Sequence, residues 1–238
     1  MKFATRDAEE LANALVATQG DTSKGGGLYA KVIPQYLHDE TANREGIFGA
    51  IDSIEQNMAK DEPGQDLAVI LFAGHGAIVD GRFYLLPHGV NASTISSIKA
   101  SGIWANEFQS ELAGLAQYGH VLVLIDACHS GAVTGDGATL ASNAELLRQT
   151  IATENVSVLT SSSADEVSFE DAKYDRHGAF TKVLLDALGA DAKDHLSGLV
   201  STTALTHYVS THVPQLTNDK QHPRPAILFD SDILLVGQ

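Results

Sequence analysis

Residues 67–76 read LAVILFAGHG, and residues 120–131 read HVLVLIDACHSG. Each stretch is a short apolar run followed by glycine and chemically reactive side chains. Aliphatic runs of this length, without alternation, are typical of strands covered on both faces in a parallel sheet. A similar run at 156–160 (VSVLT) and weaker ones at 29–37 and 226–229 predict further strands.

Segments with helical spacing lie between these runs. Alanine and leucine recur on one face at residues 7–18, 44–60, 104–117, 179–188 and 202–212. This alternation of strand and helix predicts a three-layer α/β/α sandwich with a mostly parallel central sheet. No internal repeat or long linker interrupts the pattern, so we expect residues 1–238 to form a single domain.

The composition restricts the partners and the compartment. Thirty acidic against fifteen basic residues give a formal charge of -15, which opposes binding to nucleic acid and to anionic membranes. Cys128 is the single cysteine, so no internal disulfide can form and the chain suits a reducing cytoplasm. Neither a signal peptide nor an apolar stretch of about 18 residues is visible, so we expect a soluble cytoplasmic protein.

The two loops that follow the strongest runs are expected to meet, because ligands of open α/β sheets bind beyond the carboxyl ends of the strands. A thiol needs a neighbouring imidazole to accept its proton before it becomes a good nucleophile. Taken singly, Cys128 and His75 each have a structural alternative, since cysteine is often buried and a lone histidine is usually structural. Together they indicate a catalytic pair, with backbone N–H groups of Gly76 and Cys128 facing an oxyanion and His129 as a second candidate base.

The order strand–GHG and then strand–DACHSG resembles the catalytic pair of metacaspases, paracaspases and bacterial caspase-like peptidases (orthocaspases). The interval of 53 residues from His75 to Cys128 matches the roughly 50 residues typical of caspases. Further similar motifs cover nearly the whole chain, among them FYLLP at 83–87, SSSADEVSFE at 161–170 and HGAFT at 177–181. The resemblance implies a caspase-like fold and the activity of a cysteine endopeptidase.

The resemblance also implies a division of the domain and two departures from the family pattern. The expected parts are a large-subunit-like part at 1–135, a linker at about 132–154 and a small-subunit-like part at 155–238. Family members normally begin with a central strand, which is expected to be absent here or supplied elsewhere, for instance by further domains of a larger parent protein. Residues 191–195 (DAKDH) lack the acidic spacing and glycine of a calcium site, so no metal or other cofactor is expected, and calcium activation stays open.

The residue two before the cysteine indicates the substrate. Caspases that cut after aspartate carry Gln-Ala-Cys, whereas this chain has Asp126 at that place. In relatives specific for basic residues, three acidic positions line the primary pocket, and these correspond to Asp126, Asp7 and either Asp165 or Glu166. Carboxylates bind guanidinium and ammonium groups through charge-assisted hydrogen bonds, so the resemblance implies protein or peptide substrates cut after Arg or Lys. The structural alternatives are a helix-dipole role for Asp7 and a turn or helix start for Asp165 or Glu166.

Family members are often cut between the cysteine and the next strand. Arg148 is the basic residue of that stretch and is the expected self-processing site, unless it is an ordinary helix surface residue. Lys173 and Arg176 are the next candidates. The alternative function is a catalytically weak caspase-like module that binds partners or regulates assembly.

Overall fold

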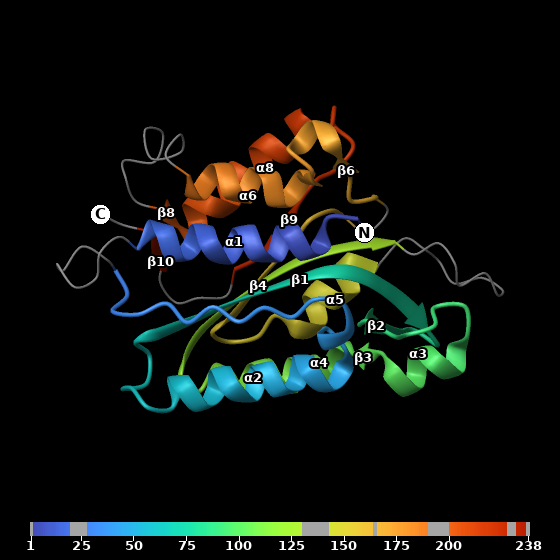
Figure 1. Cartoon of the computed structure of the whole chain (residues 1–238), viewed down its shortest axis with the longest axis horizontal. Coiled ribbons are helices and arrows are strands. Elements are labelled where there is room, and N and C mark those ends of the chain that lie inside the picture. Colours follow the sequence, from blue (N-terminus) through green and yellow to red (C-terminus); the bar gives the residue numbers. More distant parts are fainter. Residues whose placement is uncertain are drawn as a thin grey trace.

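The computed structural model describes residues 2–19, 28–129, 143–163, 166–189, 200–227 and 232–236. For residues 128–129, 143–146 and 236 the description covers the backbone only. The structure contains a six-stranded mixed sheet with helices on both faces (Figure 1). The three-layer α/β/α sandwich predicted from the sequence is therefore confirmed.

The sheet has the order β3-β2-β1-β4-β5-β9. Three central strands run parallel to one another and contain the three apolar runs: β1 (Asp66–Val79), β4 (Gly119–His129) and β5 (Val156–Thr160). The outer strands pair antiparallel with their neighbours: β2 (Arg82–Leu86) with β1, β3 (Ile103–Trp104) with β2, and β9 (Arg224–Ala226) with β5. Two small sheets join β6 (Glu170–Asp171) to β7 (His177–Gly178) and β8 (Val200–Ser201) to β10 (Leu234–Val236).

The middle strand β4 shows why a continuous apolar run suits this position. Val121, Val123 and Ile125 face one apolar cluster, whereas Leu122 and Leu124 face another. All five side chains are at most 2% exposed. Successive side chains of a strand point to opposite faces, so a strand covered by helices on both faces must be apolar at every position.

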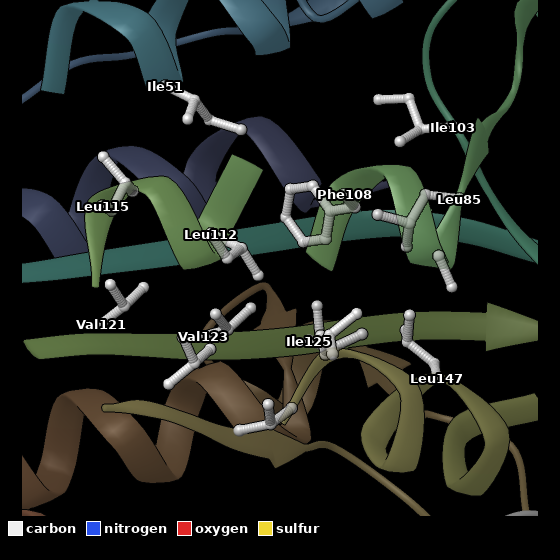
Figure 2. Packing of buried hydrophobic residues seen from close by; sticks show 14 of the residues in the cluster. Ile51, Leu85, Ile103, Phe108, Leu112, Leu115, Val121, Val123, Ile125 and Leu147 are labelled. Atoms are coloured by element: carbon white, nitrogen blue, oxygen red, sulfur yellow. The ribbon is translucent and has the colours of Figure 1, made fainter. Parts of the chain in front are cut away.

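One face of the sheet is covered by α2 (Arg44–Met58), α4 (Ala105–Leu115) and α5 (Asn143–Ile151). Figure 2 shows Phe108 and Leu112 of α4 packed over Val123 and Ile125, with Ile51 of α2 beyond them. The opposite face is covered by α1 (Ala4–Thr18), α6 (Ala179–Leu188) and α8 (Thr202–Leu216) (Figure 1). A smaller helix, α3 (Ile95–Ser101), packs Ile98 against β1 and β2. The helices predicted from spacing are present with slightly different ends.

Two predictions about strands need correction. Residues 29–37 form no strand. They contain Pro34, which has no backbone N–H to donate to a neighbouring strand. The side chains of Gln35 and Tyr36 hydrogen-bond to α2 and α1 instead. Of residues 226–229, only Ala226 lies in a strand, and 228–229 fall outside the described residues. Within the described residues α1 precedes every strand.

The predicted division into two parts and a linker stays a prediction. The linker expected at about 132–154 contains α5, whose Leu147 and Ile151 are fully buried. Strand β5 of the expected small-subunit-like part pairs directly with β4 of the large-subunit-like part.

None of the helices in the described parts of the chain is long and apolar enough to cross a membrane.

Candidate active site

The register of the two longest strands brings the proposed catalytic residues together. His75 of β1 lies directly opposite Cys128 of β4, and Ala73 lies opposite Asp126. Neighbouring strands are about 4.8 Å apart, so the backbone of the cysteine is one strand spacing from the histidine. The sequence predicted this meeting from the positions of the two residues after apolar runs, and the structure places them side by side.

The expectation that His75 lies in a loop at the end of its strand was wrong. Strand β1 continues through His75 to Val79 and pairs with β2, with His75 opposite Leu86. The reason is that residues 77–79 are apolar: Ala77 and Val79 pack in a cluster with Tyr84 and Leu86, whereas Ile78 packs on the opposite face against the cluster under α2 and α4. His75 is half-buried.

Aromatic rings lie close to both glycines beside His75. A Cβ atom on Gly76 would lie 2.3 Å from Cζ of Phe83, and one on Gly74 would lie 3.0 Å from the ring of Phe72. The first distance is far below van der Waals contact, so no larger residue fits at position 76 unless Phe83 moves. The oxyanion role expected for the Gly76 and Cys128 backbone stays a prediction.

Two carboxyl groups, one from β4 and one from α1, lie close to Gly178. Asp126 of β4 and Asp7 of α1 both have 0% exposure. A Cβ atom on Gly178 would lie 2.8 Å from Oδ2 of Asp126 and 3.3 Å from Oδ2 of Asp7, so both side chains reach the same small space. The structure thus brings the two aspartates together, whereas their role in a substrate pocket stays a prediction.

Asp126 is the unusual member of the pair. Neither of its carboxyl oxygens has a hydrogen-bond partner among the described residues. Burial raises its pKa from 3.8 to about 7; nearby hydroxyls of Ser161 and Ser168 lower it, and the charges of Asp7 and Glu170 raise it. The two hydroxyls bond to each other, with 2.5 Å between the Oγ atoms. Burial therefore outweighs the two hydroxyls, and the fold favours the protonated form of Asp126 more than water does.

Asp7 is held by its neighbours. Burial raises its pKa from 3.8 to about 6, against the lowering effect of His177 and of the Gly178 N–H. Nδ1 of His177 lies 2.6 Å from Oδ1 of Asp7, and the Gly178 N–H donates to Oδ2 at 3.2 Å. The other ring nitrogen of His177 lies 3.0 Å from Oε2 of Glu10. The His177 ring therefore holds the Asp7 carboxyl group in place, with Glu10 on its other nitrogen. The HGAFT motif alone did not reveal this role.

Glu170 is the third acidic residue near this space. Its charge raises the pKa of both Asp7 and Asp126. Its carboxylate accepts hydrogen bonds from the backbone N–H groups of Lys2 (2.9 Å) and Phe3 (3.4 Å). Sequence reasoning missed it, because nothing in the sequence pairs the start of the chain with residue 170.

Glu166, expected in the pocket, is engaged elsewhere. Its carboxylate contacts His222, with Oε1 2.5 Å from Nδ1 and Oε2 accepting the His222 N–H at 2.7 Å. Burial would raise its pKa, but these bonds and the Ser163 N–H hold it below the usual value. The contacts of Glu166 thus connect two loops rather than joining Asp7 and Asp126. Asp165, the other candidate, lies outside the described residues.

Arg148 lies inside α5, not in an open linker. Its Nη1 donates to the carbonyl oxygen of Pro225 at 2.9 Å, and its neighbour Leu147 is fully buried. Lys173 and Arg176 are exposed, and Arg176 has a positive φ of 65°.

Among the described residues no group of three His, Cys, Asp or Glu side chains could hold a metal ion, and residues 191–195 are not described.

The chain is similar in sequence to known caspase domains. The family model of the caspase domain (Peptidase C14) matches residues 3–229. No curated protein sequence matches. Protein GSU0716 from Geobacter sulfurreducens has a similar structure, with a TM-score of 0.53 and 16% identity over 94% of this chain and 84% of that one. Caspase-1 from Spodoptera frugiperda gives a TM-score of 0.51 and 13% identity over 100% of this chain and 83% of that one. The structural likeness supports the fold, and the match over residues 3–229 shows that this chain belongs to the caspase-domain family.

Proposed function

We propose that this chain is a cysteine endopeptidase that cleaves peptide bonds after arginine or lysine. The observation that carries the proposal is the register that pairs His75 with Cys128 in a chain of the caspase-domain family. Caspase domains are typically cysteine peptidases. The single thiol of the chain is expected to stay reduced in the cytoplasm, where we propose that the protein acts.

In the proposed reaction, His75 accepts the proton of the Cys128 thiol and the sulfur attacks the carbonyl carbon of the scissile bond. Backbone N–H groups of Gly76 and Cys128 stabilise the negative oxygen that develops. The tetrahedral intermediate collapses, the C–N bond breaks, and His75 gives its proton to the leaving amine. Water, deprotonated by His75, then hydrolyses the thioester and restores the thiol.

The preference for a basic side chain is supported by the state of Asp126. A buried ionised carboxylate without partners is costly, and a guanidinium or ammonium group would relieve that cost. Both oxygens of Asp126 lack partners among the described residues, and Asp7 lies beside them. We therefore assign Asp126 as the main acceptor of the basic side chain and Asp7, oriented by His177, as the second.

Hydrolysis of matched fluorogenic peptides ending in Arg, Lys or Asp tests the proposal, with and without calcium. Cys128→Ala and His75→Ala should each abolish cleavage after Arg and Lys. The matched control His88→Ala changes an exposed histidine and should leave the rate unchanged. Cleavage after Asp would refute the assignment of the acidic pair. An absence of cleavage by the folded protein would favour the alternative, a catalytically weak module that binds partners.

Self-processing after Arg148 is part of the proposal, but α5 must unwind first. Peptidases of this kind bind extended substrates, and Arg148 lies in a helix anchored by Leu147 and Ile151. We therefore expect cleavage there to be slow in the native state and faster when α5 is destabilised, for example by Leu147→Ala. N-terminal sequencing of the products would distinguish Arg148 from the exposed Lys173 and Arg176.

A further inference from the structure

A buried glutamine joins the two ends of the segment that follows β5. Gln221 lies between α8 and β9 and has 0% exposure. Its Oε1 accepts a hydrogen bond from the Phe169 N–H at 2.8 Å, and its Nε2 donates to the carbonyl oxygen of Ser161 at 2.9 Å. These partners precede it in the chain by 52 and 60 residues. One side chain therefore fixes the distance between Ser161 and Phe169.

An amide is the side chain that this position requires. One partner is a hydrogen-bond donor and the other is an acceptor, so only one orientation of the amide satisfies both. Buried backbone N–H and C=O groups need such partners, and leaving them unpaired costs free energy. A methionine at position 221 has a similar length and shape, but it would leave both backbone groups without this partner.

The two residues held by this amide adjoin a pair of buried hydroxyl groups. Ser161 carries one hydroxyl, and Ser168, which precedes Phe169, carries the other. The two serines are 1% and 5% exposed, and 2.5 Å separates their Oγ atoms. The Ser161 N–H donates to the carbonyl oxygen of Ile125 at 2.8 Å. Ser161 thus continues the ladder between β4 and β5 to the level of Asp126.

The hydroxyl pair acts on the charge of Asp126. Hydroxyls that donate to a carboxylate stabilise its ionised form, and both serines lower the pKa of Asp126 against the larger effect of burial. With their help the pKa is about 7, so the ionised and protonated forms are balanced near neutral pH. A guanidinium group forms a charge-assisted hydrogen bond only with the ionised form. A small displacement of the hydroxyls therefore changes the fraction of the protein that can bind a cation there.

Other titratable groups surround the same carboxyl group. The charges of Asp7 on α1 and Glu170 on β6 raise the pKa of Asp126. His177 on β7 contacts Asp7, with 2.6 Å between Nδ1 and Oδ1. His222, the residue after the glutamine, hydrogen-bonds to two carboxylates of its own. A substitution at position 221 keeps all of these groups in the chain, so the wild type and the variant differ in how the hydroxyls are held.

We propose that Gln221 is a positioning residue, whose amide holds the two serine hydroxyls beside Asp126 so that the carboxylate stays available for a basic side chain. The part that concerns the basic side chain rests on the proposed function. The glutamine hydrogen-bonds to backbone groups of the serine segment, so it acts on Asp126 through the serines.

An NMR titration of the Asp126 carboxyl group tests the positioning role directly. Aspartate is labelled with ¹³C at Cγ, and the Asp126 signal is identified by its absence in Asp126→Asn. Gln221→Met should raise the pKa of Asp126, so that the carboxylate binds its proton about tenfold more tightly. Gln221→Asn, whose amide is too short to span both partners, should act in the same direction and replaces the methionine variant if that variant does not fold. The matched control Gln56→Met changes an exposed glutamine of α2 and should leave the titration unchanged.

A double variant tests whether the effect passes through the serines. Ser168→Ala removes one hydroxyl and should raise the pKa of Asp126 by itself. Because the glutamine acts through this hydroxyl, Gln221→Met should add less in the Ser168→Ala background than in the wild type. Fully additive effects would overturn the inference.

Binding of acetylarginine amide to the Cys128→Ala chain measures the consequence for a basic side chain, with acetylcitrulline amide as the neutral control. Tenfold tighter protonation reduces the ionised fraction of Asp126 at pH 7 from about a half to about a tenth. Gln221→Met should therefore weaken binding of acetylarginine amide about fivefold at pH 7 and hardly at pH 9, where the carboxylate is mostly ionised in both proteins. A general loss of packing would weaken binding at both pH values.

An Asp126 pKa that is the same in the wild type and in the Gln221 variants would overturn the inference, and so would an equal loss of binding at pH 7 and pH 9. Hydrolysis of the Arg peptide by the chain with its cysteine intact is measured in parallel. A raised Asp126 pKa without binding and without hydrolysis would refute the proposed function and leave the positioning of the hydroxyls standing.

Discussion

Replacing Asp126 by asparagine should stabilise the substrate-free protein and at the same time impair cleavage after a basic residue. The substitution keeps the shape of a side chain with 0% exposure and removes the charge that burial disfavours. Most substitutions of buried residues destabilise a protein, so a gain in stability together with a loss of activity is a distinctive outcome.

The size of the gain depends on pH. Burial raises the pKa of Asp126 from 3.8 to about 7, so the folded state holds this proton more tightly than the unfolded state does. The fold therefore loses stability as the pH rises from 3.8 to about 7, and the loss is complete above that. With about 1.4 kcal/mol for each pKa unit, the loss is about 2 kcal/mol at pH 5 and about 4 kcal/mol at pH 8. Asparagine avoids this loss, although its own unpaired amide atoms reduce the gain.

Urea unfolding at pH 5 and pH 8 measures the effect. The advantage of Asp126→Asn over the wild type should grow by roughly 2–3 kcal/mol between the two values. The kcat/KM for the Arg peptide should fall about 100-fold, since a charge-assisted hydrogen bond is worth about 1.5–3 kcal/mol. The control Asp52→Asn, at an exposed position of α2, should change neither quantity. A stability difference that does not depend on pH, or an unchanged kcat/KM, would refute the reasoning.

Three further predictions concern individual contacts. Gly178→Ala places a Cβ atom 2.8 Å from Asp126 and should lower the free energy of unfolding by about 1–3 kcal/mol in a urea titration. The control Gly49→Ala has open space around it in α2 and should raise the free energy of unfolding by up to about 1 kcal/mol. Phe108→Ala should cost about 3–5 kcal/mol, because the ring is 1% exposed; a cost under about 1 kcal/mol would contradict its place in the core. Hydrogen bonds from the His222 ring to the carboxylates of Glu166 and Asp219 raise the pKa of His222 above 6.5, so Glu166→Gln should lower that pKa in an NMR titration. The stability from this pair is fully present below pH 6.5 and is lost as the pH rises through the folded pKa; an unaltered His222 titration would contradict the contact.

The sequence predicted the central sheet because its signal is local. The runs at 67–73, 120–126 and 156–160 lie in β1, β4 and β5. Each is apolar at nearly every position, and only a strand covered on both faces accommodates such a run in so few residues. The segment 29–37 has a weaker apolar pattern. Whether it pairs as a strand depends on which segments lie beside it in the fold, and the local sequence pattern does not reveal these neighbours.

The site was predictable in part. The pairing of His75 with Cys128 followed from two similar loops after two similar strands. The acidic pair came from the family resemblance, not from any local pattern. His177 and Glu170 escaped notice because their partners Asp7, Lys2 and Phe3 are more than 160 residues away along the chain. Glu166 was assigned to the pocket because it follows β5, but its hydrogen bonds to His222 could not be read from spacing.

The ladder between β4 and β5 should hold the protein together if the chain is cut after folding at a point between β4 and α5. Val121, Val123 and Ile125 on one strand pair with Val156, Val158 and Thr160 on the other, and such a cut breaks none of these contacts. A nicked chain would therefore migrate as two bands in denaturing electrophoresis and as one particle in gel filtration. Its two pieces would come apart only under conditions that melt the whole core.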